Sequence, residues 1–539
     1  MKWGWVAAAA LLGACATPPA EDAHEPLSPA ALLSHVEVLA SDEFEGRSPG
    51  TRGEELTVQY ISDQFYRAGL QPGVNGSWIQ EVPLATAEVT NNPTLTLGAN
   101  TYAYGSDFVA WTKRQNEPRI SLENAELVFV GYGVNAPEND WNDYEGVDVR
   151  GKIVVVLVND PDFDTGDDRG FGGRRMTSYG RCTYKYEEAA RQGAAGVLIV
   201  HETAAAAYPW AVVESSWTGP QHDLARADHG AGRVAVEGWI TNDVARTLFA
   251  NAGLDFDAER ARAQNRGFTP VPLNQTASIT LETTIETHMS RNVIGVLPGR
   301  DRPNEAILYG AHWDHLGRCT PVDGDDICNG ALDNATGVAG LIELARRYQA
   351  DGPPERSVAF LAFTAEESGL LGSEHYALHP TFEPRNTVAM INMDGLSIVG
   401  PSREMMVVGY GQSNLDQMLT EAAQTQNRAV NPEAFPERGS FYRSDHFNLA
   451  KIGVPVLYAG SGTDLVDGGR ERGRALSEAY VANRYHKPDD EITPDWDLTG
   501  ATMDLELLYA VGRRLADGEE WPVWGETSEF RAAREAQGR

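Results

Sequence analysis

The stretch from Ile307 to Gly340 constrains the fold of this chain more than any other part of it. A short apolar run over residues 306–309 is typical of a buried strand, and His312 and Asp314 follow where that strand should end. Asp333 comes about a helix length later and precedes apolar residues at helical spacing. The strand thus ends near a histidine and an aspartate, and another acidic residue begins the next helix. This arrangement indicates half of a metal site.

The other half is expected after later strands. From residue 291 onward the chain alternates strand and helix patterns, which indicates an α/β domain with a mostly parallel sheet. Ligands of such sheets bind beyond the carboxyl ends of the strands. The expected strands are 307–309, 358–363, 388–392, 405–408 and 454–458. The polar residues near their ends, besides those above, are Glu366, Glu367, Asp394 and, in a late loop, His486.

Two histidines and three carboxylates can hold two divalent ions, because one carboxylate can bridge them. Paired metals about 3.5–4 Å apart polarise a carbonyl and lower the pKa of a shared water, which is what amide hydrolysis needs. Of the adjacent pair Glu366 and Glu367, one can be a ligand while the other is a general base. These residues therefore predict a two-metal hydrolase.

Five motifs, in this order, resemble those of the co-catalytic zinc aminopeptidases of metallopeptidase family twenty-eight, which also includes glutamate carboxypeptidases. They are His-Trp-Asp at 312–314, Asp-Asn-Ala-Thr-Gly at 333–337, Glu-Glu-Ser at 366–368, Asn-Met-Asp-Gly at 392–395 and Tyr-His at 485–486. The resemblance covers a catalytic domain over residues 28–110 and 284–516. It implies the zinc-exopeptidase fold, similar to phosphorylase/hydrolase folds, with a mixed, mostly parallel sheet flanked by helices.

The same resemblance implies a role for each residue. One zinc ion would be held by His312 and Asp394, the other by Glu367 and His486, with Asp333 as the bridge. Glu366 resembles the general base that takes a proton from the bridging water and passes it to the leaving amine. Asp314 resembles the carboxylate that orients His312.

Two tyrosines are candidates for stabilising the oxyanion. Some family members use a tyrosine just before a Ser-Asp-His motif, here residues 444–446, and Tyr442 lies one position off that pattern. Others use the tyrosine before the last ligand, which is Tyr485 and is the one we favour. His446 is expected to be a structural hydrogen bonder rather than a ligand.

Residues 111–283 form a separate unit. A strand, turn, strand, helix and strand are expected between residues 128 and 200, and the sequences DYEGVDVRGKIVVV and EEAARQGAAGVLIV within it resemble the protease-associated domain. This resemblance implies an inserted α+β domain that borders the active site and carries no catalytic residues. The unit also contains a basic cluster, consisting of Arg174, Arg175, Arg181 and Lys185, which either reads a substrate carboxylate or is a solvated loop.

The beginning of the chain has the pattern of an export signal. Lys2 precedes a short apolar run at 6–12, and Cys15 ends a stretch that resembles the lipobox of bacterial lipoproteins. We expect a signal peptide over 1–14 and a lipidated tether over 15–27, although an ordinary signal peptide is the alternative. The protein would then be a periplasmic or cell-surface lipoprotein, anchored to a membrane through Cys15, with the outer membrane favoured.

The net charge limits which partners the protein can bind, and the cysteines indicate the redox state of its compartment. The formal net charge of -33 argues against binding of nucleic acid or of an anionic membrane surface. Cys319 and Cys328 flank a short loop, so in an oxidising compartment they are the natural disulfide pair. Cys182 would be left as a free buried thiol, and residues 517–539 as a C-terminal tail.

The predicted function is removal of N-terminal residues from peptides by an exported aminopeptidase. The same site can serve a carboxypeptidase or a dipeptidase, which the basic cluster would favour. A glutaminyl cyclase is a weaker alternative, because that branch of the family uses one zinc ion. A receptor-like binding protein without catalysis is the alternative from another class.

Overall fold

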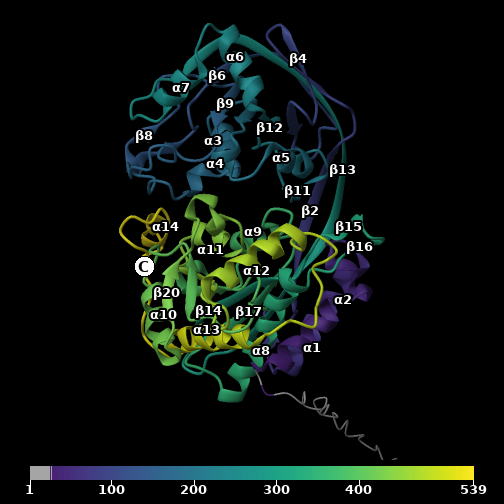
Figure 1. The fold of residues 1–539 in the computed structure, drawn as a ribbon, viewed down its shortest axis with the longest axis vertical. Coiled ribbons are helices and arrows are strands. Elements are labelled where there is room, and N and C mark those ends of the chain that lie inside the picture. The colour runs from purple at the N-terminus through teal and green to yellow at the C-terminus, as the bar shows by residue number, and fades with distance from the viewer. Residues whose placement is uncertain (1–24, 26) are drawn as a thin grey trace, which may run out of the picture.

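The computed structural model describes residues 25 and 27–539, so the predicted signal peptide and Cys15 lie outside the described residues. The chain forms two lobes that lie one above the other in Figure 1, and strand β13 (Val271–Leu297) runs along one side of both. Among the residues that the structure describes, no helix combines the length and the apolar character needed to cross a membrane. The predicted α/β fold with a mixed sheet is confirmed.

The sheet of the lower lobe carries the expected strands. Its order is β2 (Ile79–Val89), β13, β17 (Arg356–Phe363), β14 (Arg302–His312), β18 (Thr387–Asn392), β21 (Val456–Ser461), β19 (Glu404–Val408) and β20 (Ala429–Pro432). The four central strands β17, β14, β18 and β21 are parallel. Every residue of β17 and β18 is buried, which explains the apolar runs at 358–363 and 388–391 within them.

Helices cover both faces of this sheet. Helices α1 (Pro29–Leu39), α2 (Arg52–Arg67), α8 (Thr336–Asp351), α10 (Leu415–Ala423) and α13 (Thr499–Asp517) contribute to one apolar core. Helices α9 (Leu371–Leu378) and α11 (His446–Lys451) lie together on the second core, with residues from the end of the chain. Helix α12 (Gly469–Asn483) is different, because only its Gly473 is buried.

The upper lobe is built on its own sheet. Strands β6 (Arg119–Phe129), β9 (Ile153–Leu157), β10 (Gly196–Val200) and β12 (Val236–Ile240) are parallel neighbours in that order, and β5 (Phe108–Trp111) pairs antiparallel to β12. Helix α3 (Cys182–Arg191) packs on β10. Strand β13 pairs with β6 up to Glu282 and with β2 from Thr283 onward, so the chain changes sheets within one strand.

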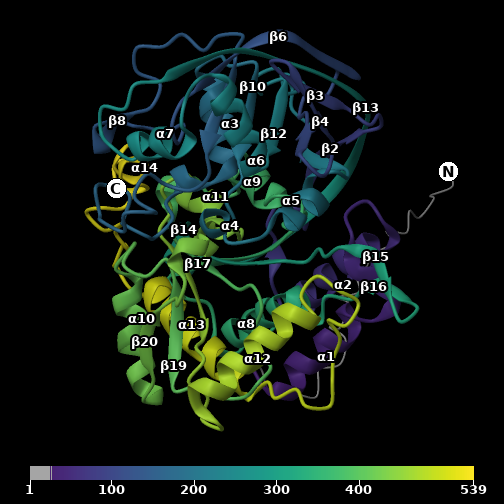
Figure 2. The ribbon, with the colours of Figure 1, turned by 45° about the horizontal axis from the view of Figure 1, so that its top comes forward.

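The end of the chain is part of the folded structure. Residues 517–539 are expected from the sequence to be a tail, but Trp524 and Phe530 are buried in the second core of the lower lobe. The indole of Trp524 donates a hydrogen bond to the carbonyl of Gly453 at 2.9 Å. Figure 2 shows α14 (Arg531–Glu535) and the C-terminus beside the upper lobe.

The predicted disulfide is present. Cys319 and Cys328 are bonded across the hairpin of β15 (Gly317–Val322) and β16 (Asp325–Cys328). Cys182 is a free thiol, as expected, but it is only partly buried.

Candidate metal centre

Three parallel strands bring the candidate residues to one edge of the lower sheet. His312 is the last residue of β14 and lies opposite Phe363, the last residue of β17. Asn392 ends β18 and pairs with Gly310 of β14. The loops that follow these strand ends therefore meet at one place, and they carry the other candidate carboxylates.

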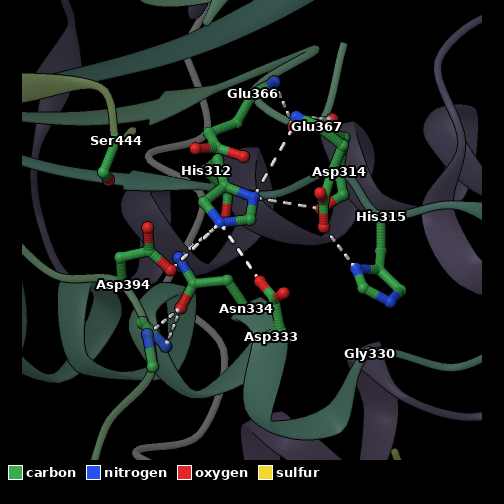
Figure 3. Close-up of polar contacts among 12 residues, drawn as sticks. His312, Asp314, His315, Gly330, Asp333, Asn334, Glu366, Glu367, Asp394 and Ser444 are labelled. Carbon is green, nitrogen blue, oxygen red and sulfur yellow. Dashed lines mark hydrogen bonds and ion pairs between the residues drawn. The ribbon is translucent and has the colours of Figure 1, made fainter. Parts of the chain in front are cut away.

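The first group of ligand atoms surrounds His312. Its Nε2 atom lies 3.4 Å from Oδ1 of Asp333 and 3.4 Å from Oδ1 of Asp394, as seen in Figure 3. The Nδ1 atom donates a hydrogen bond to the main-chain oxygen of Asp314 at 3.1 Å. Because a carbonyl oxygen only accepts, this bond places the ring proton on Nδ1 and leaves Nε2 free to bind a metal.

A second group faces the other side of Asp333. The Nε2 atom of His486 lies 3.4 Å from Oδ2 of Asp333 and 3.1 Å from Oε2 of Glu367. Asp333 thus offers a different carboxylate oxygen to each histidine. The buried Nε2 of His486 has no hydrogen-bond partner among the described residues. A histidine nitrogen that faces two carboxylates without a hydrogen bond has the arrangement expected of a metal ligand.

The separations within both groups suit a shared ion. In a tetrahedral zinc site with bonds of about 2.0–2.1 Å, neighbouring ligand atoms lie roughly 3.3 Å apart. The nitrogen–oxygen distances from His312 and His486 are 3.1–3.4 Å, longer than charge-assisted hydrogen bonds of about 2.7–2.9 Å. The residues present fit two cations bridged by Asp333.

His315, which was not predicted from the sequence, belongs to the second group. Its Nδ1 atom lies 2.7 Å from Oε1 of Glu367, and its ring centroid is 5.6 Å from that of His486. The 2.7 Å contact is a hydrogen bond to Oε1 of Glu367, whereas His486 lies closest to the other oxygen, Oε2. The available signal was position, because His315 stands three residues after His312 in the same loop.

Asp314 lies beside His312 but contacts other groups with its side chain. Its Oδ1 atom accepts the N–H of Glu366 at 3.0 Å and its Oδ2 atom accepts that of Glu367 at 3.3 Å. The distance from Oδ1 to His312 Nδ1 is 3.7 Å, so His312 is oriented by the main-chain oxygen of this residue. Burial raises the pKa of Asp314 to about 7. The carboxylate therefore fixes the backbone of the glutamate pair.

Glu366 faces the same space without contributing to either ligand group. Burial raises its pKa well above the usual range, with His312 opposing that shift and Asp394 adding to it. The preceding residue, Ala365, has a left-handed backbone with φ of 51°. Such strain in a non-glycine residue costs of order 1–3 kcal/mol and persists only where the surroundings impose it.

Hydrogen bonds fix the turn that carries Asp333. The carboxylate of Asp490 accepts the N–H groups of Leu332 and Asp333, each at 3.1 Å. The Asn334 side-chain oxygen accepts the N–H of Gly337 at 3.0 Å, and a Cβ atom on that glycine would lie 2.2 Å from it. Beneath the turn, fully buried Arg47 donates to four main-chain oxygens, those of Leu39, Trp313, Asn329 and Gly330.

The two candidate tyrosines lie in different surroundings. Tyr485 is 44% exposed, and its ring stacks on that of His486 at 3.8 Å between centroids. Tyr442 is buried, and its hydroxyl donates to Glu529 at 2.6 Å. A third tyrosine, Tyr458, lines the same cavity and donates to the main-chain oxygen of Asp394 at 3.1 Å. The buried ring of His446 packs against Tyr458 and is in neither ligand group.

A cavity of about 570 Å³ lies over the ligand groups and is lined by both lobes. Asp333, Glu366 and Tyr485 line it from the lower lobe, whereas Lys113 and Arg181 line it from the upper lobe. Of the predicted basic cluster, only Arg181 reaches this cavity. Lys185 is buried and donates to the main-chain oxygens of Tyr132, Asn159 and Tyr179. Arg174 lies over the ring of Phe163.

Comparison with known proteins gives two family matches. Residues 292–510 match the model of peptidase family M28, and residues 123–228 match that of the PA domain. The M28 stretch contains every candidate ligand, the candidate base and both candidate tyrosines. The PA stretch contains most of β6, all of β9 and β10, and Arg181.

Individual relatives share limited identity. A protein of Pyrenophora teres f. teres (strain 0-1) named "Probable zinc metalloprotease" is 38% identical over 111 residues, which is 21% of this chain and 23% of that one. Aminopeptidase YwaD of Bacillus subtilis (strain 168) is 28% identical over 212 residues, 38% of this chain and 40% of that one. The matched stretch thus spans about a quarter of the length of the first of these relatives.

Fold comparison extends over nearly the whole chain. The structure of an aminopeptidase from Aneurinibacillus sp. strain AM-1 aligns with 92% of this chain and 96% of its own, with a TM-score of 0.51 and 20% identity. Both lobes therefore share their arrangement with a solved protein. Residues 292–510 are thus similar to peptidase family M28, and residues 123–228 are similar to the PA domain.

Proposed function

We propose that this protein is an aminopeptidase that hydrolyses the N-terminal residue from peptides with the help of two zinc ions. The observation that carries the proposal is the placement of Asp333, whose two oxygens each face a different histidine with a different carboxylate beside it. The names of the relatives from Pyrenophora teres and Bacillus subtilis support zinc and aminopeptidase chemistry.

The proposed ligands divide into two sets. His312 and Asp394 would hold one ion, Glu367 and His486 the other, and Asp333 both. When bound, such a pair of ions polarises the scissile carbonyl and makes water more acidic. His315 is a positioning residue. Its hydrogen bond holds Oε1 of Glu367, and Oε2 of the same carboxylate lies toward His486.

Proton transfer is assigned to Glu366. Its carboxylate faces the cavity while its backbone is held by Asp314, so it can take a proton from water and deliver it to the leaving amine. Burial followed by the nearby carboxylates raises the pKa of Tyr485, which keeps its hydroxyl protonated. Tyr485 can therefore donate to the developing oxyanion, whereas the hydroxyl of Tyr442 is already bonded to Glu529.

The test combines metal analysis with hydrolysis of free and N-acetylated aminoacyl-anilides. We expect about two zinc ions per chain, turnover of the free amino termini only, and a loss of 10²–10⁴-fold in kcat for Glu366→Ala with metal content unchanged. Glu187→Gln, which alters another cavity carboxylate, is the matched control and should keep its activity. Turnover only of C-terminally free, N-blocked peptides would replace the aminopeptidase by a carboxypeptidase, and a protein that binds no metal would contradict both.

We also propose that the protein is exported, as a lipoprotein anchored through Cys15. The disulfide between Cys319 and Cys328 supports an oxidising compartment, because such bonds are rare in reducing ones. Fractionation of cells that express the wild type or Cys15→Ala tests the anchor. The variant should leave the membrane fraction, and an unchanged distribution would contradict lipid attachment at this residue.

A further inference from the structure

Two arginines from different lobes line the cavity without a carboxylate partner. Arg181 lies just before α3 in the upper lobe, and Arg443 lies in the loop before Ser444 in the lower lobe. Across the described residues, the side chain of Arg181 meets no hydrogen-bond acceptor, and its Nε atom is buried. The Nε atom of Arg443 donates to the main-chain oxygen of Arg438 at 3.2 Å, and its guanidinium lies 5.9 Å from the ring centroid of Tyr208.

Three acidic residues that line the cavity with these arginines, Glu187, Glu237 and Glu374, already contact other side chains. Glu187 lies 3.6 Å from Arg233, and Glu374 lies 2.7 Å from Arg226. Glu237 accepts a hydrogen bond from the indole of Trp111 at 3.0 Å. Within residues 27–539, no carboxylate forms an ion pair with either guanidinium group.

Arg181 and Arg443 are also close enough to affect one another. The Arg443 side chain is exposed at the cavity, and partial loss of solvent followed by the charge of Arg181 lowers its pKa. Two like charges beside a cavity, one with a buried unsatisfied donor, are unfavourable in the free protein. A bound anion would relieve both costs, and a carboxylate suits them because guanidinium groups bind it with two parallel hydrogen bonds.

We propose that Arg181 and Arg443 form a carboxylate subsite that holds the far end of the substrate while its N-terminal residue lies at the metal centre. This proposal rests on the proposed aminopeptidase function and adds a substrate class, namely short peptides with a carboxylate at their far end. The cavity of about 570 Å³ has the size of a small-molecule site. Residues of both lobes line it, so a substrate that reaches from the metal centre to the arginine pair must match the distance between them.

The kinetic test compares the tripeptide Leu-Ala-Ala with its C-terminal amide. We expect kcat/KM to be at least tenfold higher for the free acid, mainly through KM, because a charged hydrogen bond is lost in the amide. Arg181→Gln and Arg443→Gln should each reduce that preference severalfold while leaving hydrolysis of the amide unchanged. Arg174→Gln, a member of the same basic cluster outside the cavity, should behave as wild type.

A further substrate and a binding measurement complete the test. Leu-Glu-Ala amide has a side-chain carboxylate but no C-terminal one. Its kcat/KM should exceed that of Leu-Ala-Ala amide only if the side-chain carboxylate reaches the subsite. Calorimetry with the Glu366→Gln variant measures the affinities for Leu-Ala-Ala and for its amide without turnover. Equal kcat/KM and equal affinity for acid and amide would overturn the subsite alone. Absence of turnover with a retained difference in affinity would instead contradict the aminopeptidase.

Discussion

His315 contributes to the centre through one hydrogen bond, the 2.7 Å contact with Oε1 of Glu367. Residues that orient a metal ligand typically contribute 10–100-fold to metal affinity. We therefore expect His315→Ala to weaken one of the two zinc sites by that factor, because Glu367 is then free to turn, and to leave the site of His312 and Asp394 unchanged. Competition with a chelator measures the two affinities separately.

A conservative variant separates positioning from general damage. His315→Asn keeps a side-chain donor and should recover part of the lost affinity. His375→Ala, on α9 in the same lobe, is the matched histidine control and should bind both ions as wild type does. Equal loss at both sites in His315→Ala would refute a specific role for this residue.

The buried ring of His446 makes stability depend on pH. Burial lowers its pKa to about 3, from the ordinary value of 6.5. Between these values the unfolded chain binds a proton there that the folded protein does not, so this residue's contribution is fully present above pH 6.5 and falls as the pH drops toward 3. In His446→Gln, the slope of unfolding free energy against pH between 4 and 6 should be smaller by about 1.4 kcal/mol per pH unit.

Denaturant unfolding of metal-free wild type and variant at several pH values gives that slope. Other titrating groups are common to both proteins and cancel in the difference. Parallel curves for the two proteins would show that His446 is protonated in the folded state or does not titrate in this range.

The types and order of residues in the sequence were sufficient to predict which residues form the candidate metal site. They were not sufficient to predict the hydrogen bonds of that site. His312, Asp333, Glu367 and Asp394 could be selected because each follows a recognisable strand or begins a helix. His486 was selected from a motif in a late loop, and the structure brings all five together. His315 and the backbone bonds of Asp314 could not, since they depend on how a loop turns after its strand. The assigned roles stay predictions.

At the scale of elements, Asp490 links the late loop to the turn that carries Asp333. Its carboxylate accepts the N–H groups of Leu332 and Asp333 and lies 3.2 Å from the hydroxyl of Tyr480. Asp490→Ala leaves these buried donors without acceptors, at about 1–3 kcal/mol each. We expect it to lower the free energy of unfolding by about 2–4 kcal/mol and to weaken zinc binding. Denaturant titration and metal analysis measure the two effects.

The isosteric variant provides the comparison. Asp490→Asn keeps one side-chain oxygen and should lose roughly half as much stability. Asp489→Asn changes the exposed neighbour and should change neither quantity. If Asp490→Ala unfolded at the same denaturant concentration as wild type, the turn would not depend on this carboxylate.

Elements buried on both faces were the easiest to predict from sequence. The runs in β17 and β18 are continuously apolar because helices cover both sides, and their predicted bounds differ from the observed ones by at most two residues. Strand β13 was missed, because its 27 residues alternate in burial and cross from one sheet to the other. Such a strand is defined by its partners β6 and β2, which lie more than 140 residues earlier.

At the scale of the whole molecule, the cavity requires both lobes in a fixed relation. Strand β13 joins them on one side, and a second connection runs through the end of the chain. Glu529 is partly buried and accepts hydrogen bonds from the hydroxyl of Tyr442 in the lower lobe and from the N–H and hydroxyl of Ser178 in the upper lobe. Ser178 is three residues from Arg181, so this contact also locates one wall of the cavity.

Removing the Glu529 carboxylate should therefore loosen the upper lobe over the metal centre. We expect Glu529→Ala to lower the free energy of unfolding by about 2 kcal/mol, because it leaves buried donors unsatisfied, and to speed hydrogen exchange in residues 176–182. Glu535→Ala, which removes an exposed ion pair with Arg531 on the same segment, is the control and should change neither. Because Arg181 moves with this wall, KM for Leu-Ala-Ala should rise in Glu529→Ala while zinc content stays the same. Unchanged exchange and KM would mean that β13 alone holds the lobes in register.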